Sequence, residues 1–244
     1  MLATRQFAVI IPTMQRSPLL WEQLPHYLAS ELVAEVVIIN NVPAAIDVEH
    51  PKLRVLAQER NIYVNPAWNL GVASSTAPLL CIANDDLLFD PHLLHAAARI
   101  LRMPCGILGP NESTFRGVTS EALADSTGRA GRLRVKPVYR RTAGFGTLMF
   151  MRRSSYVPIP ETMRIHFGDD YLFHQQRHRN LTFSGFPVTT PMSTTTSDPG
   201  FLPLWDGDLR GYRAVAPTRF ERRFGWEPKA ARRLARTAKR LRRR

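Results

Sequence analysis

The sequence has few cysteines and no long apolar run. Its two cysteines, Cys81 and Cys105, show neither metal-site nor redox-motif spacing. This favours buried, inert thiols of a cytosolic protein over a disulfide framework. The apolar run near the N-terminus is too short for a signal peptide, and no segment approaches the roughly 20 apolar residues of a membrane-spanning helix. We therefore expect a soluble, cytoplasmic protein.

Acidic residues are missing from the end of the chain, and glycine is missing after the first apolar run. The net charge is +13, but residues 229–244 alone carry nine basic residues. Of the 33 Lys and Arg residues, 24 precede this segment, together with all 20 acidic residues, so the positive charge belongs mostly to a tail.

The turn Pro12–Ser17 has no glycine. This argues against a sugar-phosphate nucleotidyltransferase, which would want a glycine-rich phosphate loop there.

Apolar runs alternate with helical patterns over the first hundred residues. Except at 53–56, which alternates like a strand nearer a sheet edge, the runs do not alternate with polar residues, which is typical of strands covered on both faces. Pro25 falls inside the first expected helix and is expected to kink or shorten it. The order predicts an α/β domain with a mostly parallel sheet flanked by helices. We expect strands at 7–11, 36–39, 53–56, 79–83 and 146–151, and helices starting near Pro18, Pro66, Pro91 and Asp169.

Two acidic sites follow these elements. Asn84–Asp86 comes directly after the apolar run 79–83. Ligands of open α/β sheets bind beyond the carboxyl ends of the strands, so two carboxylates and an amide there can hold a cation and its anion. An Asx-rich turn is the alternative. Asp169 and Asp170 form the second site, and their alternative role is to place negative charge in the first turn of a helix.

Five segments in this order resemble the nucleotide-sugar-dependent glycosyltransferases of the GT-A type, especially the large family 2 group. The resemblance covers roughly residues 7 to 195 and implies a Rossmann-like GT-A fold with a mixed, mostly parallel sheet. Asn84–Asp86 lies where that family has its Asp-any-Asp motif, and Gly168–Asp170 resembles its later acidic pair. The segments are 7–16, 36–41, 65–71, 84–86 and 168–170.

The resemblance implies an inverting, metal-assisted transfer of a sugar from a nucleotide-diphosphate sugar, with a UDP-sugar favoured, to an acceptor hydroxyl. Asp86 and Asn84 would hold Mn or Mg. Asp170 would be the general base, and Asp169 would orient it or the acceptor. The acceptor would be a glycan, a lipid or a protein. The residues expected at the donor are Pro12, Thr13, Arg16, Asn40, Asn41, Asn69, Asn84 and Asp85.

The chain departs from the family pattern in its metal ligands. Asn84 replaces the first acid of the motif, and residues 186–193 lack the histidine that often supplies a further ligand. A water or Asp198 could take that place. Arg152 and Arg153, or an arginine of the loop at 111–143, could contact phosphate, while the two arginines at the strand end could also simply be solvated. Residues 111–143 read as a long loop that shapes the acceptor site.

We expect a GT-A domain over 1–215 and a basic helical tail over 216–244. The tail could rest at an anionic membrane, contact a protein assembly or solubilise the chain, while nucleic acid is the less favoured partner. A protein with this tail could instead be a catalytically silent GT-A-like module. Such a module would bind nucleic acid or a protein assembly through its arginines.

Overall fold

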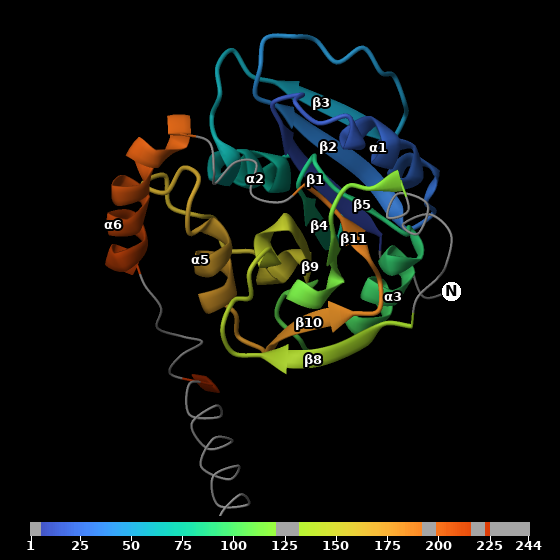
Figure 1. Ribbon diagram of the computed structural model, residues 1–244, viewed down its shortest axis with the longest axis vertical. Coiled ribbons are helices and arrows are strands. Elements are labelled where there is room, and N and C mark those ends of the chain that lie inside the picture. Colours follow the sequence, from blue (N-terminus) through green and yellow to red (C-terminus); the bar gives the residue numbers. More distant parts are fainter. Residues whose placement is uncertain (1–5, 121–131, 192–198, 216–222, 225–244) are drawn as a thin grey trace, which may run out of the picture.

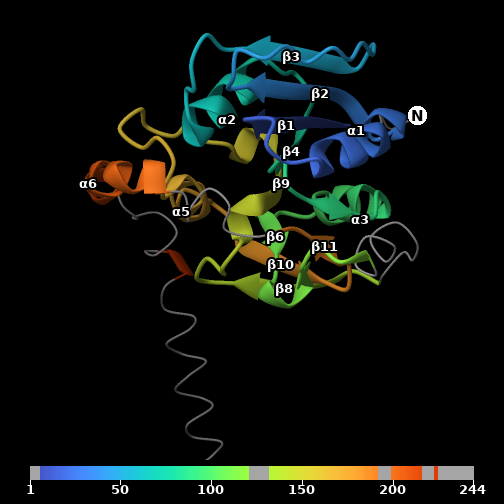
Figure 2. The same ribbon diagram turned by 45° about the horizontal axis from the view of Figure 1, so that its top comes forward.

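An eight-stranded mixed sheet forms the middle layer of the protein. The structure is a computed structural model that describes residues 6–120, 132–191, 199–215 and 223–224 (Figure 1). The strand order is β3-β2-β1-β4-β9-β6-β10-β8, and Figure 2 shows these strands one after another from top to bottom. The strands are β1 (Phe7–Thr13), β2 (Val33–Asn40), β3 (Leu53–Ala57), β4 (Leu79–Ala83), β6 (Leu108–Pro110), β8 (Arg134–Val138), β9 (Leu148–Arg152) and β10 (Asn180–Ser184).

The first four of these strands pair in parallel, and the later ones make the sheet mixed. β1 lies between β2 and β4, and β3 pairs with β2. β9 runs antiparallel to both β4 and β6, whereas β6 and β10 are parallel. The carboxyl ends of β1, β2 and β4 therefore meet at one edge of the sheet.

Helices cover both faces of the sheet, which explains why its central strands β1 and β4 are buried along their whole length. Along β1, Phe7, Val9 and Ile11 pack with α1 (Leu19–Ala29) and α3 (His92–Ile100). The intervening Ala8 and Ile10 pack in a second core with α2 (Val64–Ala73) and α5 (Gly168–His174). Figure 2 shows α1 and α3 on one side, and α2, α5 and α6 (Trp205–Val215) on the other. Each residue of β1 is thus buried on one face or the other.

Shorter elements complete the fold. A small second sheet has the order β5-β11-β7. Among the described residues, no helix is both long and apolar enough to span a bilayer. The short elements are β5 (Leu88–Phe89), β7 (Phe115–Arg116), β11 (Val188–Thr189), η1 (Glu112–Thr114), η2 (Phe145–Thr147), η3 (Arg153–Ser155) and η4 (Pro199–Leu204).

The α/β class and the mostly parallel sheet are confirmed, but Pro25 does not end its helix. The proline removes the hydrogen bond that its position would donate to the carbonyl of Trp21. Both residues lie on the exposed face, where water can bond that carbonyl. Burial of Leu20, Leu24 and Tyr27 holds the helix on the sheet, so α1 continues to Ala29.

The expectation of a long loop at 111–143 is wrong in part. η1, β7 and β8 lie in this range, and residues 121–131 fall outside the described part. β8 has no apolar pattern because it is an edge strand, exposed over four of its five residues and paired only with β10. The strand expected from residue 146 begins at Leu148, because Thr147 closes the turn η2 by donating its hydroxyl to the carbonyl of Gly144. The tail expected over 216–244 lies outside the described residues, apart from Arg223 and Phe224.

Candidate active site

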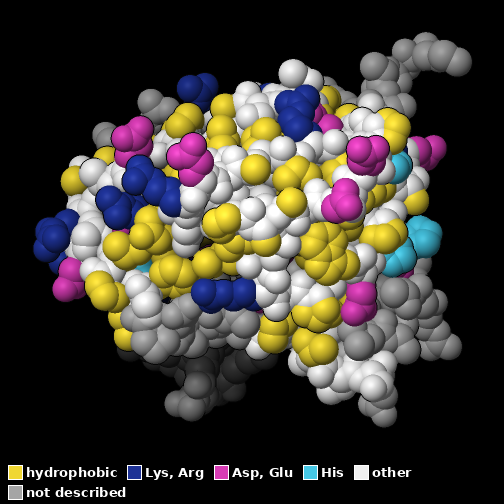
Figure 3. Space-filling model, turned by 90° about the horizontal axis from the view of Figure 1, so that it is seen from above, with side chains coloured by type: hydrophobic (Ala, Val, Ile, Leu, Met, Phe, Trp, Pro, Cys, Tyr) yellow, Lys and Arg dark blue, Asp and Glu magenta, His cyan; other side chains and the backbone are white. Residues whose placement is uncertain are grey.

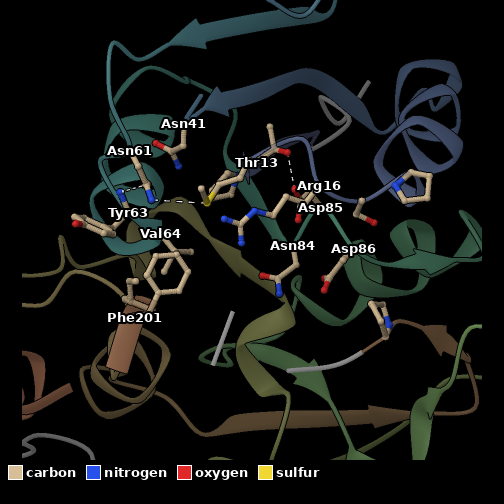
Figure 4. Close-up of a pocket in the computed structure, with 16 residues that line it drawn as sticks. Thr13, Arg16, Asn41, Asn61, Tyr63, Val64, Asn84, Asp85, Asp86 and Phe201 are labelled. Carbon is tan, nitrogen blue, oxygen red and sulfur yellow. Dashed lines mark hydrogen bonds between the residues drawn. The ribbon is translucent and has the colours of Figure 1, made fainter. Parts of the chain in front are cut away.

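A cavity of about 330 Å³ opens where β1, β2 and β4 end (Figure 4). The carboxyl ends of neighbouring parallel strands form the ligand-binding edge of an α/β sheet. Seven residues expected at a donor or metal site line this cavity. They are Pro12, Thr13, Arg16, Asn41, Asn84, Asp85 and Asp86.

A hydrogen bond joins the ends of β1 and β4 inside this cavity. The hydroxyl of Thr13 donates to Oδ2 of Asp85 over 2.5 Å and accepts from the backbone N–H of Gln15 over 2.8 Å. The pKa of Asp85 is raised above its usual value, chiefly by burial and also by the charge of Asp86. The hydrogen bond from Thr13 opposes this rise. Asp85 is therefore held by the protein at the floor of the cavity.

Asn84 and Asp86 are better placed to meet a ligand. Figure 4 shows both side chains projecting to the same side of the end of β4, and Arg16 lines the same cavity. Asp86 is buried, with 5% of its surface exposed. Within the described residues, no group of three His, Cys, Asp or Glu side chains is arranged to hold a metal. A carboxylate with an amide oxygen nevertheless suits Mg²⁺ or Mn²⁺ bound chiefly through water and a ligand phosphate, so the donor set fits such an ion.

Two asparagines expected at the donor lie outside the cavity lining. Asn40 donates from its amide to the carbonyl of Ala44 and accepts from the side chain of Gln15. Asn69 donates to the carbonyl of Ile159 and accepts from that residue's N–H. Both amides hold loops in place, whereas Asn41 reaches the cavity.

One wall of the cavity comes from residues that the sequence analysis missed. Oδ1 of Asn61 accepts from the N–H of Tyr63, whose φ of 69° is left-handed. The rings of Tyr63 and Phe201 lie 6.4 Å apart, edge to face, and the guanidinium of Arg164 lies 5.6 Å from the Tyr63 ring. The Asx turn at Asn61 could have been read from the sequence. The arrival of Phe201, 138 residues after Tyr63, could not.

Arg152 and Arg153 do not face the cavity. Arg152 donates to the carbonyls of Leu101, Met103 and Cys105 beyond the end of α3. Arg153 donates to the carbonyls of Val72 and Ala77 at the end of α2. A cation at a helix C-terminus satisfies carbonyls that have no partner within the helix. The expectation that these arginines contact phosphate is therefore wrong, and Arg16 is the arginine in the cavity.

The second acidic site lies at the start of α5 and is held by Arg141. The guanidinium lies 3.2 Å from Oδ2 of Asp169 and 2.8 Å from Oδ1 of Asp170. Burial raises the pKa of Asp169 to about 6, Arg141 opposes this, and the charge of Asp170 adds to it. Each of the two carboxylate side chains is 19% exposed.

A short chain of contacts connects the two acidic sites. The N–H of Asn84 donates to the carbonyl of Thr147 over 2.9 Å. The preceding Gly146 packs so closely on Asp169 that an added Cβ would lie 2.7 Å from Oδ2. The turn η2 therefore connects the end of β4 with the start of α5, as expected if both sites serve one reaction.

The histidines near α5 have structural contacts. His166 is buried, with its ring 4.8 Å from that of Trp205. Nδ1 of His174 lies 2.9 Å from the hydroxyl of Tyr212. Neither lines the cavity. Asp198, suggested above as a third metal ligand, is outside the described residues.

Comparison with solved structures shows that the fold is the GT-A fold of glycosyltransferases. The chain is similar to S. aureus TarS 1–349, with a TM-score of 0.53 and 12% identity over 86% of this chain and 72% of that one. The same protein in complex with UDP-GlcNAc gives a TM-score of 0.53 and 14% identity over 90% and 73% of the two chains. GalNAc-T7, with UDP, GalNAc and Mn²⁺, gives 0.57 and 11% over 85% of this chain and 48% of that one. No family model and no curated protein matches the sequence.

Proposed function

We propose that this protein is an inverting, metal-assisted glycosyltransferase that uses a nucleotide-diphosphate sugar, with a UDP-sugar as the favoured donor. The observation that carries the proposal is the position of Asp85 and Asp86. They follow β4 and line a cavity that also contains residues from the ends of β1 and β2. The similar structures of TarS with UDP-GlcNAc and of GalNAc-T7 with UDP and Mn²⁺ support this choice of donor.

The cavity divides by chemistry into two parts. Asn41, Asn61 and the ring of Tyr63 offer hydrogen bonds and a flat face to a nucleoside, with Thr13 at the cavity floor. Arg16 offers a cation to the diphosphate. Asp86 and Asn84 would hold the divalent ion, which would neutralise the charge that develops on the diphosphate as it leaves. Asn40 and Asn69 would act only by shaping the surrounding loops.

The second acidic site would supply the base. The acceptor oxygen attacks the anomeric carbon while its proton passes to the carboxylate of Asp170. The bond from that carbon to the diphosphate oxygen breaks, and its electron pair leaves with the nucleotide. Because attack and departure occur on opposite faces, the anomeric configuration inverts. Asp169 would orient Asp170.

Calorimetric titration with nucleoside diphosphates, UDP foremost, tests the donor site. We expect one nucleotide to bind in the presence of Mn²⁺, and Asp86→Ala to reduce its affinity at least about tenfold, because a charged metal ligand is lost. Asp47→Ala is the matched control, since Asp47 is exposed and lies outside the cavity. If no nucleotide binds with any metal, the proposal fails. A catalytically silent module acting through its arginine-rich tail then becomes the function to test.

Donor turnover tests the base. With UDP-GlcNAc and UDP-GalNAc as probes, we expect Asp170→Asn to leave nucleotide binding intact and to lower turnover by about 100-fold or more, as loss of a general base does. Proton NMR of the first sugar product reports its anomeric configuration. Retention of configuration would contradict the inverting mechanism, and full activity of Asp170→Asn would contradict the assignment of the base.

A further inference from the structure

Arg141 contacts both Asp169 and Asp170, and the proposed reaction gives it no role. It lies between β8 and η2, 31% exposed, and its guanidinium reaches both carboxylates at the start of α5. Burial lowers the pKa of Arg141, but the charges of Asp169 and Asp170 outweigh this effect and raise it. One planar guanidinium thus bridges two neighbouring acids, a geometry that a lysine point charge cannot reproduce.

The contacts leave the two acids unequal. Oδ1 of Asp169 accepts from the backbone N–H of Asp170 over 3.0 Å, and its Oδ2 faces Arg141. Oδ1 of Asp170 also faces Arg141. In the described part of the chain, the fourth oxygen, Oδ2 of Asp170, has no such contact. Asp170 therefore keeps one carboxylate oxygen for a substrate, while Asp169 keeps none.

We propose that Arg141 is a positioning residue that orients Asp170 through Oδ1 and leaves Oδ2 to take the acceptor proton. This inference rests on the proposed function. Arg141 is the charged side chain that contacts both acids, and Tyr212, from α6, acts on Arg141 itself by raising the pKa of its guanidinium. Without Arg141, two adjacent carboxylates would repel each other, and one would hold a proton to higher pH.

The experiment measures UDP release from UDP-GlcNAc and UDP-GalNAc by the full chain as a function of pH. For Arg141→Ala we expect kcat to fall about 100-fold, close to the loss of a general base, with KM for the donor little changed. The acidic limb of the pH profile should move up by about 1 to 3 units, because an opposite charge is removed from a carboxylate. Guanidinium chloride at millimolar concentration should restore part of the rate. Arg141→Lys should restore less than the native arginine supplies.

Arg140→Ala is the matched control, because it removes the same charge one residue away from an exposed side chain. It should keep the rate and the pH profile of the native chain. An unchanged profile in Arg141→Ala, with donor turnover intact in the native chain, overturns the inference and leaves the proposed function standing. If no nucleotide binds to the native chain, the proposed function itself is overturned.

Carboxyl ¹³C NMR does not depend on turnover. The Asp170 signal is identified by its loss in Asp170→Asn. We expect its chemical shift to change in Arg141→Ala, because the contact with the guanidinium is lost, and to stay unchanged in Arg140→Ala. If the signal is the same in both variants and in the native chain, Arg141 does not orient Asp170. Circular dichroism of each variant confirms that it is folded.

Discussion

At the scale of single residues, buried and part-buried carboxylates have different roles according to their partners. Asp85 receives a hydroxyl hydrogen bond from Thr13, Asp86 faces the cavity, and Asp169 and Asp170 share Arg141. A sequence shows the pairs but does not show which member is engaged by the protein. That distinction decides which acid can act on a ligand.

Asp208 is a further buried acid, and its role is to hold a loop. Its carboxylate oxygens accept hydrogen bonds from the backbone N–H groups of Arg164, Ile165 and His166, with N···O distances of 2.8 to 2.9 Å. We expect Asp208→Ala to lower the free energy of unfolding by about 2 to 4 kcal/mol, because buried donors lose their acceptor. Urea unfolding measures this. Asp206→Ala, an exposed acid on the same helix, should change stability by less than about 0.5 kcal/mol.

Asp169 should make stability depend on pH. Its pKa is about 6 in the folded protein, against about 3.9 when unfolded. Between these values the folded state binds more protons, so this residue's contribution to stability falls as pH rises from about 4 to 6. We expect Asp169→Asn to flatten this part of the profile and to be more stable than the native chain at pH 7 by about 1 to 3 kcal/mol. An unchanged slope in thermal unfolding across this range would refute the assignment.

At the scale of elements, the turn η2 connects β4 to α5, and Gly146 permits the close approach. An added methyl group would lie 2.7 Å from Oδ2 and 2.8 Å from Cβ of Asp169. Gly146→Ala should therefore cost about 1 to 3 kcal/mol of stability through overpacking and should lower donor turnover by displacing the acidic pair. Gly117→Ala is the control, since its added methyl group meets nothing within 4 Å. Equal behaviour of the two variants would show that the approach is not tight.

Element prediction from the sequence succeeded where burial was complete. β1, β2 and β4 are covered on both faces, so their apolar runs were sufficient to identify them. β8 was missed because an edge strand needs no apolar side chains, and its pairing with β10 joins residues about 45 positions apart. α6 was missed because only Asp208 and Gly211 of its eleven residues are buried.

At the scale of the whole molecule, charge is divided unevenly between residues 1–228 and residues 229–244. On the face seen in Figure 3, basic and acidic side chains are interspersed. This is expected because residues 1–228 contain 24 basic and 20 acidic residues. The described residues that line the cavity all lie in the range from Pro12 to Phe201. Binding of a nucleotide should therefore not depend on residues 229–244.

Truncation after residue 228 separates these two properties. We expect the shortened chain to bind the same nucleotide with unchanged affinity. It should lose salt-sensitive binding to anionic phosphatidylserine vesicles, because nine basic residues are removed and each contributes about 1 kcal/mol near such a surface. Calorimetry and vesicle sedimentation measure the two effects. Loss of nucleotide binding on truncation would place the tail in the donor site.

The sequence by itself determined the α/β class, the approximate positions of the apolar strands and the two acidic segments, because burial and strand order leave a local pattern. Only the tertiary structure showed that Asn40 and Asn69 support loops, that Arg152 and Arg153 cap helix ends, and that Phe201 completes the cavity wall. It also brought Arg141 to Asp169 and Asp170. Each of these depends on which distant segment lies beside a side chain. Contacts between segments far apart in the chain are made by packing, which no local pattern of residue types encodes.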